Sequence, residues 1–108
     1  MPAGLLLALA IAVEVAATLA LRASDGFTRV APSVAVVVGY ATAFFLLGLV
    51  LRSIPVSVAY AVWSAVGTAM VALIGMTLLD EPAGAIRIAS LVLIIVGVVA
   101  LNLAGSAE

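Results

Sequence analysis

Cysteine and histidine are both absent from this 108-residue chain, and charged residues make up only 8% of it. The lack of cysteine excludes disulfides and thiolate-bound metals, and the lack of histidine removes the commonest metal ligand and proton carrier. We therefore expect neither a metal site nor a cofactor. Four basic and five acidic residues give a formal net charge of −1, which leaves no basic surface for nucleic acid.

Apolar residues take the place of the missing polar ones. They account for 68% of the chain, against about 45–50% in soluble domains. A transmembrane helix needs about 20 apolar residues to cross a hydrocarbon core of about 30 Å. A chain of 108 residues holds four such helices with short connections, and the composition excludes a water-soluble fold.

Four apolar stretches predict an all-α membrane protein with one four-helix domain over residues 1–108. The stretches are continuous and about twice as long as the ~10-residue alternating strands of a membrane barrel. The first stretch has no basic segment before it, which disfavours a cleaved signal peptide. We expect the acids and proline of Asp80-Glu81-Pro82 at the start of the last helix. The predicted spans are residues 3–21, 30–51, 54–79 and 83–104.

Glu14 lies in the middle of the first stretch. A charge at that depth costs about 2.5–3.5 kcal/mol on insertion scales, so we expect a functional group that binds a proton or a cation. The alternative is a permanently protonated glutamic acid that hydrogen-bonds a neighbouring helix. Helical spacing puts several small residues on its face, where they leave room for a ligand or for another helix. This face carries Leu7, Ala10, Ile11, Ala17 and Thr18.

Aromatic residues in the second and third stretches lie deeper than the interfacial aromatic belt of membrane proteins. Aromatic faces attract cations, especially desolvated organic ones. A carboxylate and aromatic faces are the smallest set of groups that can bind a lipophilic cation. The alternative interpretation of these aromatic residues is ordinary packing between helices. The residues concerned are Tyr40 and Phe44 in the second stretch, and Tyr60 and Trp63 with the neighbouring Ser64 in the third.

Small residues in the last two stretches predict bending and helix contacts. Gly67 lies in the middle of the third stretch, on the face of the aromatic residues, and permits either a hinge or close packing. Ser90 and Gly97 are two turns apart in the fourth stretch. That spacing suits a helix–helix seam, which we expect in a dimer.

Several strings of residues together resemble the small multidrug resistance family of bacterial exporters. They are AIAVEVAATLALR around Glu14, SDGFTR followed by Pro32, Tyr40, and IPVSVAYAVWSAVG from residue 54 to residue 67. The similarity extends over the whole chain in length, number of spans and loop pattern. The resemblance implies a proton-coupled antiporter of the bacterial inner membrane that works as an antiparallel homodimer.

The resemblance also implies roles for individual residues. The membrane-embedded glutamate of the family corresponds to Glu14, and its substrate-contacting aromatics correspond to Tyr40, Tyr60 and Trp63. Tyr40, and the lack of a tryptophan one turn after Glu14, resemble the branch that exports quaternary ammonium cations. The expected substrate site is completed by Ala10, Thr18, Phe44 and Ser64.

The chain departs from the family pattern at three positions where glycine is common, namely Ala17, Ala65 and Ser90. Ala65 is expected to stiffen the bend in the third span, and Ser90 makes the seam of the fourth span bulkier. These changes bear on dimer geometry and substrate range, and they leave the carboxylate of Glu14 in place.

The implied mechanism is competition between protons and a lipophilic organic cation for Glu14, with the site exposed to each side of the membrane in turn. One subunit has too few helices to enclose a drug-sized cavity, so we expect a dimer surrounded by membrane lipid. Three alternatives stay open: one subunit of a paired heterodimeric exporter, a guanidinium exporter, or a non-transporting assembly subunit. We expect no enzyme, because the sequence shows neither a nucleophile–base pair nor a metal cluster.

Overall fold

The computed structural model describes residues 2–107, which form four helices and no strand. The helices are α1 (Ala3–Ala23), α2 (Val30–Val50), α3 (Val56–Leu78) and α4 (Ala85–Ala107). Each contains a segment long and apolar enough to cross a membrane. A helix satisfies its backbone hydrogen bonds internally, as an apolar medium requires. The prediction of an all-α protein with four membrane spans is confirmed.

The connection between α2 and α3 is longer than expected. The amides of Ser53 and Ile54 both bond back to the carbonyl of Val50, at 3.0 Å each, and so continue the end of α2 as turns. Pro55 has an extended backbone and precedes the first residue of α3. Because Pro55 has no amide hydrogen to donate, it fits this place before the first turn. Helix α3 therefore begins two residues later than the predicted span.

The acidic pair after α3 ends that helix and does not begin the next one, contrary to our expectation. Asp80 has a positive φ of 56°, a left-handed conformation that terminates helices. The amides of Leu79 and Glu81 then both donate to the carbonyl of Gly75, at 3.1 and 3.0 Å. Helix α4 begins at Ala85, with no acidic residue in its first turn.

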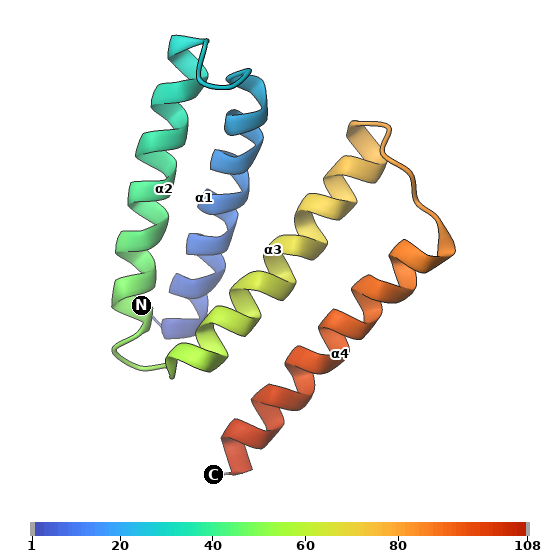
Figure 1. The fold of residues 1–108 in the computed structure, drawn as a ribbon. Coiled ribbons are helices and arrows are strands. Elements are labelled where there is room, and N and C mark those ends of the chain that lie inside the picture. Colours follow the sequence, from blue (N-terminus) through green and yellow to red (C-terminus); the bar gives the residue numbers. More distant parts are fainter. Residues whose placement is uncertain (1, 108) are drawn as a thin grey trace. The chain divides into compact units, whose positions relative to one another are not determined.

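The chain divides between Ile54 and Pro55 into two compact units. In the first unit, α1 and α2 lie side by side and are joined by the loop of residues 24–29 (Figure 1). In the second unit, α3 and α4 are joined by residues 79–84. A single domain over the whole chain stays a prediction.

Close packing between α1 and α2 depends on a glycine. A Cβ atom added to Gly39 would lie 2.7 Å from the Cβ of Ala17 and 3.9 Å from the carbonyl oxygen of Val13. Carbon atoms in contact are normally separated by about 3.5–4.0 Å. The methyl group of Ala17 therefore fills the space that Gly39 leaves, and a larger residue at either position would push the helices apart.

The loop between α1 and α2 is organised by Ser24, whose side chain is fully buried. Its hydroxyl donates to the carbonyl of Leu21 at 2.7 Å and accepts from the amide of Phe27 at 3.1 Å. Asp25, Gly26 and Phe27 all have positive φ angles. These bonds support three successive residues in the left-handed region, which only glycine adopts without strain.

An ion pair closes the loop between α3 and α4. Arg87 donates from Nη2 to the Glu81 carboxylate and from Nη1 to the carbonyl of Pro82, both at 2.8 Å. The Glu81 carboxylate lies over Gly75, where a Cβ would otherwise be. Both side chains of the pair are more than a third exposed. In contact with water, a pair of this kind contributes no more than about 1 kcal/mol.

Much of the apolar surface is uncovered in this single chain. None of residues 85–104 of α4 is buried, and Ile86 is 85% exposed. Soluble monomers rarely expose apolar patches beyond a few hundred Å². Such a helix is stable only where lipid or another helix covers it.

We predict that Gly39→Ala lowers the free energy of unfolding by about 1–3 kcal/mol, the usual effect of overpacking. Ala17→Gly in the same chain should recover most of the loss, because it removes the methyl group that the new one meets. Denaturant unfolding of the purified protein, followed by circular dichroism, measures both.

Gly48→Ala is the matched control, since this α2 glycine has no atom within 4 Å of an added Cβ. It should leave stability unchanged or raise it through better helix propensity. Equal losses for Gly39→Ala and Gly48→Ala would contradict the tight packing of α1 on α2.

Candidate proton and cation site

Glu14 lies near the midpoint of α1 and is half-buried. One turn further along, the hydroxyl of Thr18 donates a hydrogen bond to its Oε1 at 3.1 Å. Residues four apart share one face of a helix, so this contact follows directly from the sequence spacing. It holds the carboxylate against the side of α1 that faces α2.

Tyr40 joins the site from α2. Its phenol oxygen lies 2.6 Å from Oγ1 of Thr18, a short distance for two hydroxyl groups. Tyr40 and Thr18 directly follow Gly39 and Ala17, so the close approach of those two small residues brings the hydroxyls within reach. The first unit therefore unites three residues that the sequence analysis assigned to the site.

The direction of these hydrogen bonds follows from a count of hydrogens. A threonine hydroxyl carries one hydrogen and two lone pairs, whereas an ionised carboxylate only accepts. When Glu14 is ionised, Thr18 gives its hydrogen to the carboxylate, and in that state Tyr40 donates to Thr18. The result is a chain of hydroxyls, Tyr40 to Thr18 to Glu14, that crosses from α2 to α1.

Thr18 differs in this respect from other hydroxyl residues of the helices. Hydroxyls in an apolar helix usually bond back to the carbonyl one turn earlier. Thr18 bonds instead to two side chains. The back-bonded hydroxyls are those of Ser33, Thr42, Thr77 and Ser90.

Glu14 has no ion-pair partner within the described part of its own unit, residues 2–54. Arg22 is the other charged residue of α1. It lies eight positions away, or about 12 Å along the helix axis. A carboxylate that accepts a hydrogen bond without a counter-ion can receive a proton or a cation.

The other predicted residues of the first unit lie near this chain of hydroxyls without joining it. Ala10 is fully buried, one turn before Glu14. Phe44 is 61% exposed, one turn after Tyr40. Contact of either residue with substrate stays a prediction.

The predicted residues of the second unit share one face of α3. Tyr60 is 70% exposed, Trp63 is half-buried and Ser64 is exposed. Gly67 is buried, and its role as a hinge stays a prediction. Because these residues belong to a different unit from Glu14, a site shared with Glu14 also stays a prediction.

The proposed seam on α4 lies at exposed positions. The hydroxyl of Ser90 bonds back to the carbonyl of Ile86 at 2.7 Å, so the serine adds little unsatisfied polarity. No atom lies within 4 Å of a Cβ added to Gly97. Both positions are open to a partner helix, and the seam stays a prediction.

Sequence reasoning missed Gly39 and Ser24. The signal for Gly39 was a small residue next to a deep tyrosine, a combination that permits close approach of a second helix. The signal for Ser24 was the polar run Ser24-Asp25-Gly26, which is typical of a turn with positive φ angles.

Four helices long and apolar enough to cross a membrane, one of them carrying a half-buried carboxylate, define a multi-pass membrane protein. The family model described as Small Multidrug Resistance protein matches residues 3–94. The chain belongs to this family. It is therefore a multi-pass protein of the bacterial cell membrane and a multidrug efflux transporter of cationic substrates.

Several curated relatives are similar over nearly their whole length. The quaternary ammonium compound-resistance protein QacE of Escherichia coli is 48% identical over 104 residues, which cover 96% of this chain and 94% of QacE. The multidrug resistance protein mmr of Mycobacterium leprae is 49% identical over 88% of this chain and 90% of its own. The multidrug resistance protein EbrA of Bacillus licheniformis is 44% identical over 90% of this chain and 92% of its own.

We predict that Trp63→Ala weakens binding of tetraphenylphosphonium, an aromatic organic cation, by about 1–3 kcal/mol, or roughly 5- to 150-fold. The loss combines apolar burial and cation–π attraction. Calorimetry on the purified protein measures the affinity, and proton release on raising the pH reports whether Glu14 still titrates.

Trp63→Phe is the control, because it keeps an aromatic face and should lose less affinity than Trp63→Ala. If Trp63→Ala binds the cation normally but unfolds more easily, Trp63 is a packing residue and does not contact the substrate.

Proposed function

We propose that this chain is a proton-coupled antiporter that exports lipophilic quaternary ammonium cations, with proton and cation competing for Glu14. The observation that carries the proposal is the half-buried carboxylate of Glu14, which has a hydrogen-bond donor but no basic partner in the described part of its own unit. The names of the relatives support the class of substrate, since they refer to quaternary ammonium compounds and to multiple drugs.

Competition at one carboxylate couples the two fluxes without a second site. An ionised Glu14 attracts a cation, and this attraction is stronger in a low-dielectric surrounding than in water. Protonation removes the charge and with it most of the attraction. Each ligand therefore leaves when the other binds, and protons that flow inward drive cations outward, provided that the site opens to one side at a time.

The contact with Thr18 favours a quaternary ammonium cation over a guanidinium. A guanidinium binds a carboxylate best through two parallel N–H bonds, one to each oxygen. Thr18 already donates to Oε1 of Glu14 and competes for one of those positions. A quaternary ammonium ion has no N–H to donate and needs only charge and apolar or aromatic contact.

The aromatic residues of α3 supply such contact in the proposed site. Tyr60, Trp63 and Ser64 present one polar and aromatic face, and Tyr60 is 70% exposed in the single chain. Ala10 and Phe44 complete the lining on the helices that carry Glu14 and Tyr40. A dimer would bring a second copy of each residue to the site.

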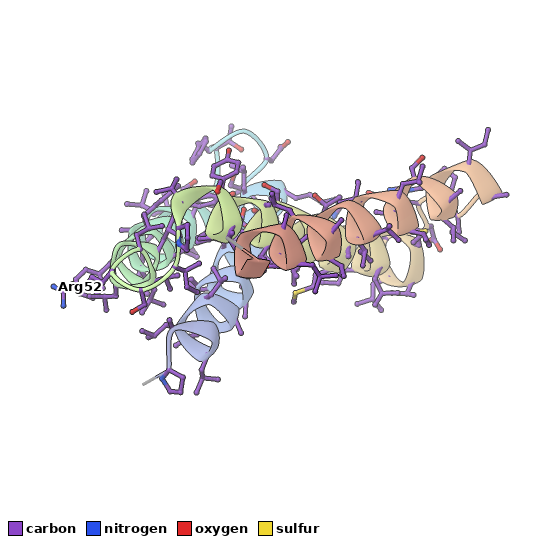
Figure 2. All side chains as sticks on the ribbon, turned by 90° about the horizontal axis from the view of Figure 1, so that it is seen from below. Arg52 is labelled. Atoms are coloured by element: carbon purple, nitrogen blue, oxygen red, sulfur yellow. The ribbon has the colours of Figure 1, made fainter. Side chains whose placement is uncertain are left out.

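An antiparallel homodimer is the assembly we propose, with Ser90 and Gly97 in its seam. The basic residues that orient membrane proteins are few here, with three arginines on one side of the membrane and one on the other. Arg52 lies in the α2–α3 connection and points away from the helices (Figure 2). On the opposite side of the membrane lie Arg22, Arg29 and Arg87.

We predict that Glu14→Gln abolishes exchange in proteoliposomes with an imposed pH gradient, because glutamine keeps the shape and loses the titrating charge. The wild-type protein should accumulate a quaternary ammonium ion against its gradient in preference to guanidinium or a polyamine. Affinity for the cation should fall as the pH is lowered, because protonation discharges the carboxylate. Uptake assays and binding curves from pH ~5 to ~9 measure both.

Glu14→Asp is the control, since it retains a carboxylate and should keep a pH-dependent affinity. Exchange by Glu14→Gln, or a wild-type affinity that stays flat with pH, would refute the antiport mechanism. A protein that moves no cation alone but does so with a sibling subunit would be half of a paired exporter. A guanidinium preference would place it in the guanidinium branch.

We predict that the chain inserts in both orientations, because the excess of arginines on one side is only three to one. Reporters fused to the C-terminus should give both cytoplasmic and external signals. Arg52→Ala should shift the distribution toward one orientation. A single orientation in the wild-type protein would contradict the antiparallel homodimer and favour paired subunits.

A further inference from the structure

We infer that Thr18 is a positioning residue that reverses a chain of hydrogen bonds when Glu14 takes up a proton, and so passes the protonation state of α1 to Tyr40 on α2. This inference rests on the proposed function, since it requires that Glu14 exchanges protons. It concerns the direction of the hydrogen bonds among Glu14, Thr18 and Tyr40. Competition between proton and cation for Glu14 does not by itself determine that direction.

The ionised state has one arrangement of hydrogens that satisfies all three groups. Tyr40 donates to Thr18, across 2.6 Å, and Thr18 donates to Oε1 of Glu14, across 3.1 Å. The carboxylate offers no hydrogen, so neither bond can run the other way while Glu14 is charged. The phenol hydrogen of Tyr40 is fully engaged in this state.

Protonation gives Glu14 a hydrogen to donate, so three hydrogens are then available for the two hydrogen bonds of the chain. Either the carboxyl hydrogen or the phenol hydrogen must then leave the chain. A carboxylic acid is a much stronger acid than a phenol, and the stronger acid makes the stronger donor. Glu14 therefore donates to Thr18, Thr18 turns its hydrogen to the oxygen of Tyr40, and the phenol hydrogen is released.

This step breaks no covalent bond in Thr18 or Tyr40. The added proton stays on the carboxyl group of Glu14, and the two hydroxyls only rotate. The oxygen positions need to change little, because 2.6 Å suits a bond between two hydroxyls in either direction and 3.1 Å needs only slight shortening. The change that reaches α2 is the freed phenol hydrogen, which can donate to a new acceptor only when Glu14 is protonated.

No other ionisable side chain in the first unit is placed to take over this role. Tyr40 is the one ionisable residue of α2, and in α1 Arg22 lies two turns from Glu14. The remaining charged residues of the described part of this unit lie in its loop or connection, and they are Asp25, Arg29 and Arg52. The Thr18 hydroxyl is therefore the direct link from Glu14 to α2.

The test is the pH dependence of tetraphenylphosphonium binding to the purified full-length protein and its variants. Thr18→Val keeps the shape and removes the hydroxyl that favours the charged carboxylate. Proton affinity should then rise about tenfold, which moves the midpoint of the binding curve up by about one pH unit. Thr18→Ser keeps the hydroxyl and should restore the wild-type midpoint, although it loses the methyl group.

Tyr40→Phe separates a relay from two independent contacts. It should shift the midpoint in the same direction as Thr18→Val by a smaller amount, because Tyr40 acts only by polarising Thr18. In the Thr18→Val background it should add no shift, which is the non-additivity expected of groups in one chain. An equal shift in both backgrounds would overturn the relay.

Infrared difference spectra between high and low pH, without substrate, test the reversal itself. A tyrosine C–O band should change on protonation, vanish in Tyr40→Phe and persist in Tyr60→Phe. A spectrum without a Tyr40 band would overturn the reversal, even if Thr18→Val fails to fold. A wild-type binding curve that is flat with pH overturns the proposed function, whereas a pH-dependent wild type with an unmoved Thr18→Val curve overturns the relay alone.

Discussion

The apolar medium requires each polar group of this chain to find its partner within the protein. Backbone groups meet the requirement by forming helices. Hydroxyl side chains within the helices meet it by donating to the backbone carbonyl one turn earlier, as Ser33 and Thr42 do. At the end of α3, Gly75 supplies a carbonyl for the amides of Leu79 and Glu81. Glu14 and Thr18 depart from this rule, because they satisfy each other and a residue of the next helix.

That departure depends on two of the smallest side chains in the protein. Ala17 and Gly39 allow α1 and α2 to approach so closely that no further methyl group fits between them. The neighbouring residues, Thr18 and Tyr40, are thereby held at hydrogen-bond distance. The methyl group of Ala17 is accommodated because position 39 is a glycine. The same turn of α1 and the same turn of α2 therefore supply both the close packing of Ala17 on Gly39 and the hydrogen bond between Thr18 and Tyr40.

Sequence reasoning predicts the features of this fold that arise from local composition. Long apolar stretches predict four helices, and a carboxylate in the middle of the first predicts a functional group, because a charge at that depth is costly. The predicted helix ends were less accurate near Pro55 and Asp80, because hydrogen bonds to the carbonyls of Val50 and Gly75 determine where the helices end. A pattern of residue types contains no information on which carbonyl a given amide will reach.

The contacts between helices could not be predicted from the sequence alone. Thr18 and Tyr40 were each assigned to the site, but helical periodicity fixes only the face of one helix and not the level at which another helix meets it. Gly39 marks that level. A small residue next to a tyrosine permits close approach of a second helix, but it does not show which residue of α1 will lie against it. The same reasoning applies to Tyr60 and Trp63, whose shared face on α3 follows from spacing while their distance from Glu14 does not.

A transporter that works by competition needs its conformational balance to respond to which ligand is bound, and only differential interactions can provide that response. The net charge of the site distinguishes an empty site from an occupied one. It does not distinguish a bound proton from a bound cation, because either ligand offsets the negative charge of Glu14. The chain of hydroxyls distinguishes the two. A cation leaves the carboxylate ionised and the Tyr40 hydrogen engaged, whereas a proton supplies a donor and reverses the chain. Tyr40 therefore has a free hydrogen in the protonated state only, and α2 can respond differently to the two ligands although both bind the same residue of α1.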